Sequence, residues 1–325
     1  MKIRLGYVAI SKTLGKKVTS SSTVTFANYK KIVSEEKKIE KLKTVALSNL
    51  VALEDILKFN IENNIHFYRI TSALIPLVTH PEVGYWGHRE MLRKDFEYIG
   101  KLIKESNMRV DTHPDEFNVI NSKNPKVVEN TLINLSRQAE WFEDMNYKNG
   151  KMVIHVGGAT GGKKEALDRF IINFNNFPKN IKEKLIIEND DKTYTAKETL
   201  ELCKKINVPM VLDIHHHNCN NNGEDIRDLL EEILSTWDKE NLPPKMHFSS
   251  PKDTNLVDKI DKKHSDYINP IDFINFVEIL KCFNRDIDIM LECKEKDIAL
   301  FKLYEDIKEL NTSYKWIDKT TMLVK

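Results

Sequence analysis

Eight short apolar runs, rich in β-branched residues, recur along this chain between longer stretches with helical spacing. Near-continuous apolar runs of this kind are typical of strands buried on both faces of a parallel sheet. They span residues 3–10, 67–75, 109–113, 152–156, 185–188, 210–214, 245–248 and 287–292. Eight strand–helix alternations predict a (β/α)8 TIM barrel, for which about 250 residues is typical. An open, doubly wound sheet is the alternative.

The segments between these runs predict helices. Apolar residues from Val128 to Phe142 keep a 4,3,4,3 spacing behind Asn124-Pro125, and residues 226–237 repeat that spacing. Asn269-Pro270 opens a third helix, and Lys30 to Lys43 is dense enough in Lys and Glu to be a solvated helix face. No linker divides the chain, so we expect a single domain: the barrel over residues 1–297, then a C-terminal helix and tail over 298–325. The tail after Asn311 carries no clear pattern.

Composition excludes several classes of protein. With 325 residues and 41% hydrophobic side chains, the chain can bury a large core and is not disordered. The 50 Lys and Arg nearly balance 49 Asp and Glu, so any nucleic-acid site must be a local patch. Four unpatterned cysteines predict reduced thiols and a cytoplasmic location. No apolar run approaches the ~20 residues of a membrane span, and no signal peptide is expected.

Histidines and carboxylates fall at the ends of seven predicted strands. In a barrel these ends converge on one face, where active sites lie. The residues are His80, His113, His155, Glu188, Asp213, His247 and Glu292. A lone histidine on a strand is more often a core residue than a ligand, but so many on one rim favour metal binding.

Imidazole and carboxylate together are ligands for Mn, Fe, Zn or Ni. The sequence therefore predicts a multinuclear metal centre at the mouth of the barrel. Such a centre generates hydroxide by lowering the pKa of bound water to about 7, which suits phosphate esters as substrates.

Four local patterns bear on this prediction. If the strand continues through residues 213–217, Asp213, His215 and His217 share one face, so only one or two of the three histidines are ligands. Lys245 and His247 also share a face, and a lysine beside metal ions is tolerated only if neutral or modified. His66 and His88 lie away from the rim and are expected to be structural or surface residues. The glycines between 157 and 162 resemble a flexible turn more than a phosphate loop.

In their order along the chain, these motifs resemble the UV damage endonuclease family. The matching segments are Arg4-Leu-Gly-Tyr7-Val, Tyr68-Arg69-Ile-Thr-Ser, Ile75-Pro-Leu-Val-Thr-His80-Pro, His113-Pro114, His155-Val-Gly-Gly, Glu188-Asn-Asp, Asp213-Ile-His-His216, Lys245-Met-His247 and Met290-Leu-Glu292-Cys-Lys. The resemblance covers residues 1 to about 297.

The resemblance implies a barrel nuclease that nicks damaged double-stranded DNA immediately 5′ to a lesion and leaves a 3′-hydroxyl and a 5′-phosphate. It implies two or three divalent ions, manganese in particular, no nucleotide cofactor and a monomer. Catalytic roles fall to Tyr7 and to Lys245, which matches a lysine that is N-carboxylated in this family. The implied metal ligands are His80, His113, His155, Glu188, Asp213, His216, His247, His264 and Glu292; His264 lies outside the predicted strands.

Two of the family's motifs are changed in this sequence. The lesion-probing Gln-Tyr pair corresponds here to Glu116-Phe117, and an asparagine near the N-terminal tyrosine corresponds to Ser11. We assign these three residues to DNA and lesion binding. The lysines in residues 12–17 and 259–263 either follow the phosphate backbone or are ordinary solvated surface. An apurinic-site endonuclease of the related trinuclear type, a barrel sugar isomerase and a metal-binding protein without activity remain the alternatives.

Overall fold

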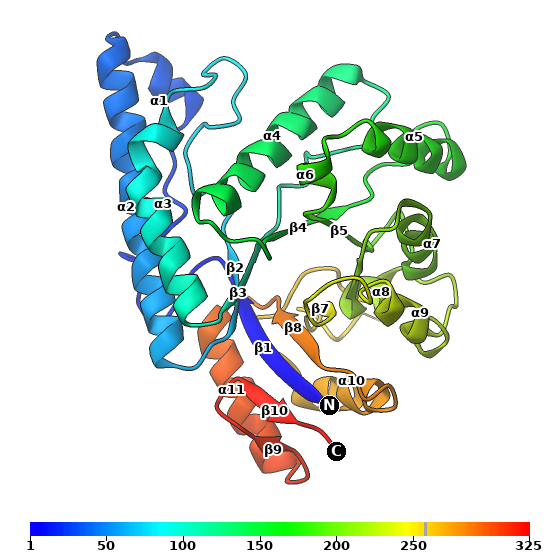
Figure 1. Ribbon diagram of the computed structural model, residues 1–325. Coiled ribbons are helices and arrows are strands. Elements are labelled where there is room, and N and C mark those ends of the chain that lie inside the picture. Colours follow the sequence, from blue (N-terminus) through cyan, green and yellow to red (C-terminus); the bar gives the residue numbers. More distant parts are fainter. Residues whose placement is uncertain (257–258) are drawn as a thin grey trace.

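The computed structural model describes residues 1–256 and 259–325 of the chain. Within them, eight parallel strands follow one another around a closed barrel, because β1 pairs with both β8 and β2 (Figure 1). This confirms the predicted TIM barrel and excludes the open sheet. The strands are β1 Lys2–Val8, β2 Phe67–Ile70, β3 Arg109–Thr112, β4 Lys151–His155, β5 Leu185–Glu188, β6 Met210–Asp213, β7 Lys245–Phe248 and β8 Ile287–Leu291.

Helices surround the barrel, and two of them begin at the asparagines that the sequence predicts. Asn124 accepts a hydrogen bond from the Lys126 amide, and Asn269 caps another helix in the same way. The predicted helical face at 30–43 is interrupted before Ser34, which caps a new helix. The helices are α1 Phe26–Lys30, α2 Glu35–Glu62, α3 His88–Glu105, α4 Pro125–Asp144, α5 Lys163–Asn175, α6 Lys179–Lys182, α7 Ala196–Ile206, α8 Ile214–Cys219, the 3₁₀ turn η1 Ile226–Asp228, α9 Leu230–Ser235, α10 Pro270–Lys281 and α11 Lys296–Leu310.

The C-terminal segment belongs to the barrel. The predicted boundary at residue 297 falls inside α11, the helix that completes the eighth β/α unit. The tail then forms β9 Lys315–Trp316 and β10 Thr321–Leu323, and β10 pairs antiparallel with β1. This pairing brings the two termini together in Figure 1, where the N-terminal ammonium donates to the Val324 carbonyl at 3.1 Å.

The second predicted strand, residues 67–75, is too long. β2 ends at Ile70, and residues 71–79 form turns because Pro76 cannot donate to a strand ladder and Leu77 adopts a positive φ of 53°. The apolar side chains there are buried in the core all the same, which explains their strand-like pattern. β6 ends at Asp213, where α8 begins. No helix in the described parts of the chain is both long and apolar enough to cross a membrane.

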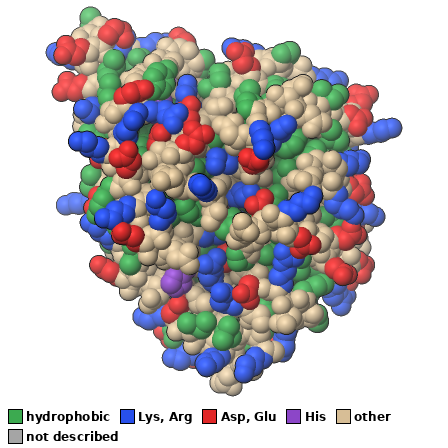
Figure 2. Space-filling model, viewed as in Figure 1, with side chains coloured by type: hydrophobic (Ala, Val, Ile, Leu, Met, Phe, Trp, Pro, Cys, Tyr) green, Lys and Arg blue, Asp and Glu red, His purple; other side chains and the backbone are tan. Residues whose placement is uncertain are grey.

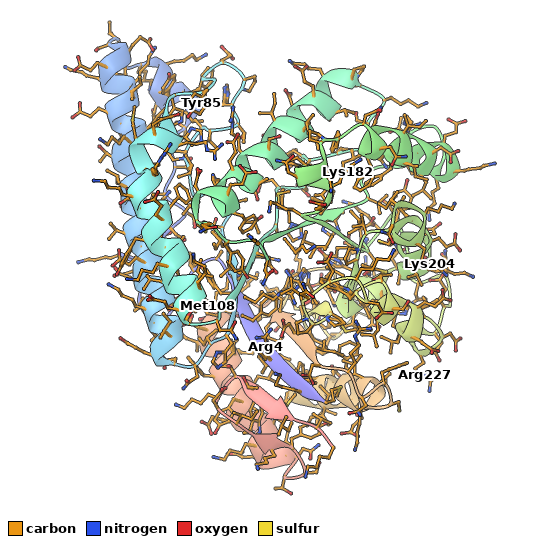
Figure 3. All side chains as sticks on the ribbon, viewed as in Figure 1. Arg4, Tyr85, Met108, Lys182, Lys204 and Arg227 are labelled. Carbon is orange, nitrogen blue, oxygen red and sulfur yellow. The ribbon has the colours of Figure 1, made fainter. Side chains whose placement is uncertain are left out.

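The barrel interior is charged in the half nearer the N-terminal ends of the strands, which is called the lower half here. Asp288 accepts hydrogen bonds from Arg4 at 2.6 and 2.7 Å and from Arg109 at 2.8 Å; Figure 3 labels Arg4 on β1. Above this layer, the Lys245 ammonium donates to Asp111 at 2.7 Å, and both side chains are fully buried. These ion pairs leave the upper layer free for the histidines and carboxylates.

Candidate metal centre

Glu188, the last residue of β5, lies at the centre of the histidine cluster. Its carboxylate is 1% exposed and accepts hydrogen bonds from His247 at 2.8 Å and from His113 at 2.9 Å. His216 and His155 lie 3.6 and 3.7 Å from the same two oxygen atoms. Four histidines therefore surround one carboxylate because four strand ends meet at this rim.

Asp213 contributes a second carboxylate and corrects the prediction for residues 213–217. The chain turns helical after Asp213, whose Oδ1 caps α8 by accepting from the His216 amide at 2.9 Å. Residues three apart are neighbours on a helix, so His216 approaches Asp213 Oδ2 to 3.8 Å. The strand periodicity applied to His215 and His217 is therefore wrong. Of the three histidines, His216 is the one in the clusters that could hold a metal.

Glu292 follows β8 and supplies the third carboxylate. Its Oε1 accepts from Arg69 Nη1 and lies 3.4 Å from His247 Nδ1, and its Oε2 lies 3.8 Å from His264 Nδ1. His264 comes from a loop that an isolated bridge to Pro251 holds against the barrel. The structure therefore brings His264 to the cluster although it lies outside the strands.

The ligand atoms fit a multinuclear site. Three groups each place their ligand atoms within 4.8 Å of one another: His113, His155 and Glu188; Glu188, Asp213 and His216; and Asp213, His247 and Glu292. Glu188 and Asp213 each belong to two groups, so the three groups adjoin and could together hold more than one cation. Asp213 Oδ2 and His247 Nε2 are buried without a hydrogen-bond partner anywhere in the described chain. Such atoms are costly to bury unless a ligand satisfies them.

Charges within the cluster are mutually stabilised. Although burial opposes ionisation, His247, His155 and His113 hold the pKa of Glu188 well below its usual range. Burial likewise opposes protonation of His216, yet Asp213, Glu188 and Glu292 raise its pKa to about 9. The carboxylates therefore favour positive charge beside them, which is the charge that a metal ion supplies.

A cavity of about 720 Å³ opens beside these residues. His113, His155, His216 and Glu292 line it, together with Arg69 and the loop residue Glu116. Figure 2 shows one face of the protein, on which Lys and Arg side chains are interspersed with Asp and Glu and a single small histidine surface is visible. The site is large enough for a phosphodiester and its neighbouring sugars.

Two residues predicted to act on DNA or in catalysis are buried elsewhere. Tyr7 is fully buried, and its hydroxyl donates to Asn60 on α2 at 2.8 Å, outside the barrel. Ser11 is 2% exposed, and its hydroxyl donates to Asp297 at 2.8 Å. Neither side chain lines the cavity, so the structure shows no contact through which Tyr7 would act in catalysis or Ser11 would touch DNA.

His80 lies apart from the cluster. Because β2 ends ten residues earlier, His80 is carried to a turn where its ring stacks on Phe26 with 3.9 Å between ring centres. Its Nδ1 accepts from the Glu82 amide at 3.3 Å. The geometry gives His80 no place in the three groups of ligand atoms.

The other predicted residues are distributed as follows. Lys245 does share the inner face with His247, but it lies one layer lower, and Asp111 resolves the predicted charge conflict. Glu116 and Phe117 are exposed beside the cavity, Phe117 by 78%. His66 pairs with Asp318 and His88 is buried near Trp86, both away from the rim, as predicted. Arg69 lines the cavity, but sequence analysis gave it no role. Because side chains alternate along a strand, its position two residues after the buried Phe67 could have indicated that it faces the barrel interior.

The lysines of residues 12–17 lie on an exposed loop that Asp297 holds in place. The Asp297 carboxylate accepts hydrogen bonds from the Lys12 and Thr13 amides at 2.6 and 3.1 Å, in addition to the Ser11 hydroxyl. Lys12, Lys16, Lys17 and Lys262 are all exposed; Lys12 pairs with Glu295 at 3.5 Å and Lys262 with Asp191 at 3.4 Å. The first loop therefore offers unburied positive charge close to β1.

Comparison with known proteins identifies the family. The family model described as UV-endonuclease UvdE matches residues 3–321. The chain belongs to the UV-endonuclease UvdE family. It is 38% identical over 312 residues to a UV DNA damage endonuclease of Bacillus cereus, covering 95% of this chain and 96% of that protein. A UV DNA damage endonuclease of Bacillus pumilus is 39% identical over 312 residues, with 95% of each chain covered.

A solved structure agrees with this assignment. The crystal structure of SacUVDE superposes with a TM-score of 0.82 at 33% identity, covering 95% of this chain and 99% of that one. The predicted resemblance and the predicted DNA repair endonuclease, a hydrolase that cleaves DNA, are thus confirmed at the level of the family. With the family established, the sugar isomerase and the inactive binding protein lose their support.

Proposed function

We propose that this endonuclease nicks double-stranded DNA immediately 5′ to UV photoproducts. In the reaction, a water oxygen bonds to phosphorus, the bond from phosphorus to the 3′ oxygen breaks, and that oxygen leaves as a hydroxyl after taking up a proton. The products carry a 3′-hydroxyl and a 5′-phosphate. The observation that carries the proposal is the set of three adjoining ligand groups around Glu188 and Asp213, open to a cavity of about 720 Å³.

We further propose manganese as the resident metal, in two or three sites. Nitrogen and carboxylate oxygen ligands without thiolate suit Mn²⁺ as well as Fe²⁺ or Zn²⁺. When bound, such ions supply a hydroxide near neutral pH and neutralise charge on the phosphate. His113, His155, His216, His247, His264, Glu188, Asp213 and Glu292 would hold them. We also propose a monomeric enzyme in the cytoplasm, where its four cysteines, all free in the structure, remain reduced.

A nicking assay tests the proposed function. End-labelled duplexes carrying a cyclobutane dimer, a 6-4 photoproduct, an abasic site or no damage are incubated with the enzyme and Mn²⁺. We expect cleavage at the phosphodiester immediately 5′ to either photoproduct and no cleavage of the intact duplex. Cleavage at the abasic site alone would favour the alternative of an apurinic-site endonuclease. Full activity in excess EDTA would contradict the metal centre.

Carboxylation of Lys245 is a separate prediction. Burial lowers the pKa of the Lys245 ammonium to about 8, so a neutral amine forms at mildly alkaline pH. That amine can attack the carbon of CO₂, forming a nitrogen–carbon bond and releasing a proton, once the ammonium leaves Asp111. We expect a carbamate carbon resonance in ¹³C NMR of metal-free enzyme equilibrated with ¹³C-bicarbonate at pH 8.5.

The control for this experiment is Lys245→Arg, which keeps the charge opposite Asp111 but cannot form the carbamate. Its spectrum should lack the resonance. A wild-type enzyme that is active with Mn²⁺ yet shows no such resonance would contradict the modification and leave Lys245 as the ammonium partner of Asp111.

A further inference from the structure

Arg69 places a positive charge among the candidate metal ligands. Side chains alternate along β2, so Arg69 faces the barrel interior together with Phe67. Its Nη1 donates to Glu292 Oε1, and the two side chains are 16% and 11% exposed. Both residues line the cavity of the metal centre. A cation at this point affects both the metal ions and any anion that enters.

Comparison with the other arginines inside the barrel shows how Arg69 differs. Arg4 donates hydrogen bonds to Asp288 from two nitrogen atoms, and Arg109 donates to Asp288 and to the Pro243 carbonyl. The unpaired nitrogens of Arg109 are enclosed, with its guanidinium 5.1 Å from the Phe67 ring centre. Those two arginines are committed to the core of the barrel.

Arg69, in contrast, uses few of its hydrogen-bond donors. Its Nε and Nη2 have no hydrogen-bond partner within residues 1–256 and 259–325, and neither atom is enclosed by protein. A guanidinium carries five N–H donors in a planar fork that matches the oxygens of a phosphate. Most of the donors of Arg69 are therefore available to a ligand in the cavity.

The charges explain why that ligand should be an anion. Arg69 Nη1 donates to Glu292 Oε1, so a cation bound to the Glu292 carboxylate lies close to the guanidinium. A divalent cation on Glu292 has the guanidinium as a like-charged neighbour, which weakens binding of the cation. A phosphate that contacts both relieves this repulsion. Binding of metal and of phosphate must then favour one another by the same factor.

We propose that Arg69 binds the substrate phosphate in the metal centre and couples phosphate binding to metal binding. The inference rests on the proposed function, because the phosphate in question is that of the DNA backbone. Inorganic phosphate offers the same chemistry and serves as the probe.

Isothermal titration of metal-free protein with Mn²⁺, and of the Mn²⁺-loaded protein with inorganic phosphate, tests the proposal. Without phosphate, Arg69→Gln should bind Mn²⁺ about tenfold more tightly than wild type, and its Mn²⁺-loaded form should bind phosphate about tenfold more weakly, within the usual range of coupling between sites. Arg69→Lys, which keeps the charge but not the fork, should lie between the two. Arg93→Gln, at an exposed position on α3, makes the same charge change and should behave as wild type.

Two outcomes would overturn the inference. Loss of Mn²⁺ sites in both Arg69 variants would show that Arg69 merely holds Glu292 in place, and unchanged phosphate affinity would show that it does not meet the anion. If Arg69→Gln fails to fold, Arg69→Lys decides the matter by the same two affinities. Neither titration requires cleavage, so an enzyme that shows the coupling but leaves photoproduct duplexes uncut would overturn the proposed function alone.

Discussion

Replacement of Glu188 by Gln should reduce nicking of a photoproduct duplex by about 1,000-fold or more, because ligands that act as a unit fail together. Glu188 takes part in two of the three ligand groups, and its two oxygens face four histidines. An amide keeps the shape of the side chain but removes its negative charge and turns one acceptor into a donor. Elemental analysis of Glu188→Gln purified without chelator should therefore show fewer equivalents of transition metal than the wild-type enzyme.

The matched control is Glu201→Gln, which makes the same chemical change at an exposed position on α7. It should retain wild-type activity and metal content. Both variants should unfold cooperatively, because the apolar core between barrel and helices is untouched. A Glu188→Gln enzyme with wild-type nicking and wild-type metal content would contradict the proposed centre.

The sequence predicted the barrel and most of the centre because both depend on local pattern. A buried strand ends in a polar residue whichever fold surrounds it, and barrel closure then brings Glu188, His247 and Glu292 to one rim. Asn124 and Asn269 fixed two helix starts through cap chemistry alone. These features need no knowledge of distant contacts.

The sequence-based predictions failed where contacts between distant parts of the chain determine the local structure. Residues 71–79 are apolar because they pack against the core, not because they extend β2, and His80 was misplaced with them. Ser11 is polar yet buried because Asp297, 286 residues later, accepts its hydroxyl. The pairing of Lys245 with Asp111 joins β7 to β3 across the barrel. The spacing of residues along the chain does not indicate which distant residues will form such pairs.

The loop after β3 presents Phe117 as an exposed ring next to Glu116, which lines the cavity of the candidate metal centre. Phe117 belongs to a turn that is closed by the Asn118 backbone amide, which donates to the Asp115 carbonyl at 3.0 Å. The Ser72 hydroxyl holds the same turn by donating to the Asp115 carboxylate at 2.7 Å. A ring that is 78% exposed on a turn anchored in this way does not pack in the core. A phenylalanine after a turn can also be a packing residue under the loop, and the exposure of Phe117 excludes that interpretation here.

We predict that Phe117 inserts at damaged steps, where poor stacking makes a wedge least costly. Phe117→Ala should weaken binding to a photoproduct duplex by about 1 to 3 kcal/mol, the contribution of one stacked base. Affinity for the undamaged duplex and the melting temperature should remain close to wild type, because little of the ring is buried in the free protein. Competition binding in Ca²⁺ without turnover would measure both affinities.

Two further variants sharpen this test. Phe117→Trp keeps a flat ring and should retain discrimination between damaged and intact DNA. Tyr98→Ala removes another exposed aromatic side chain, 42% exposed on α3, and should leave both affinities unchanged. Equal losses on damaged and intact duplexes for Phe117→Ala would mean that the ring contacts DNA in general. Lesion recognition would then have to come from the cavity itself, because distortion of the duplex would no longer be read by this turn.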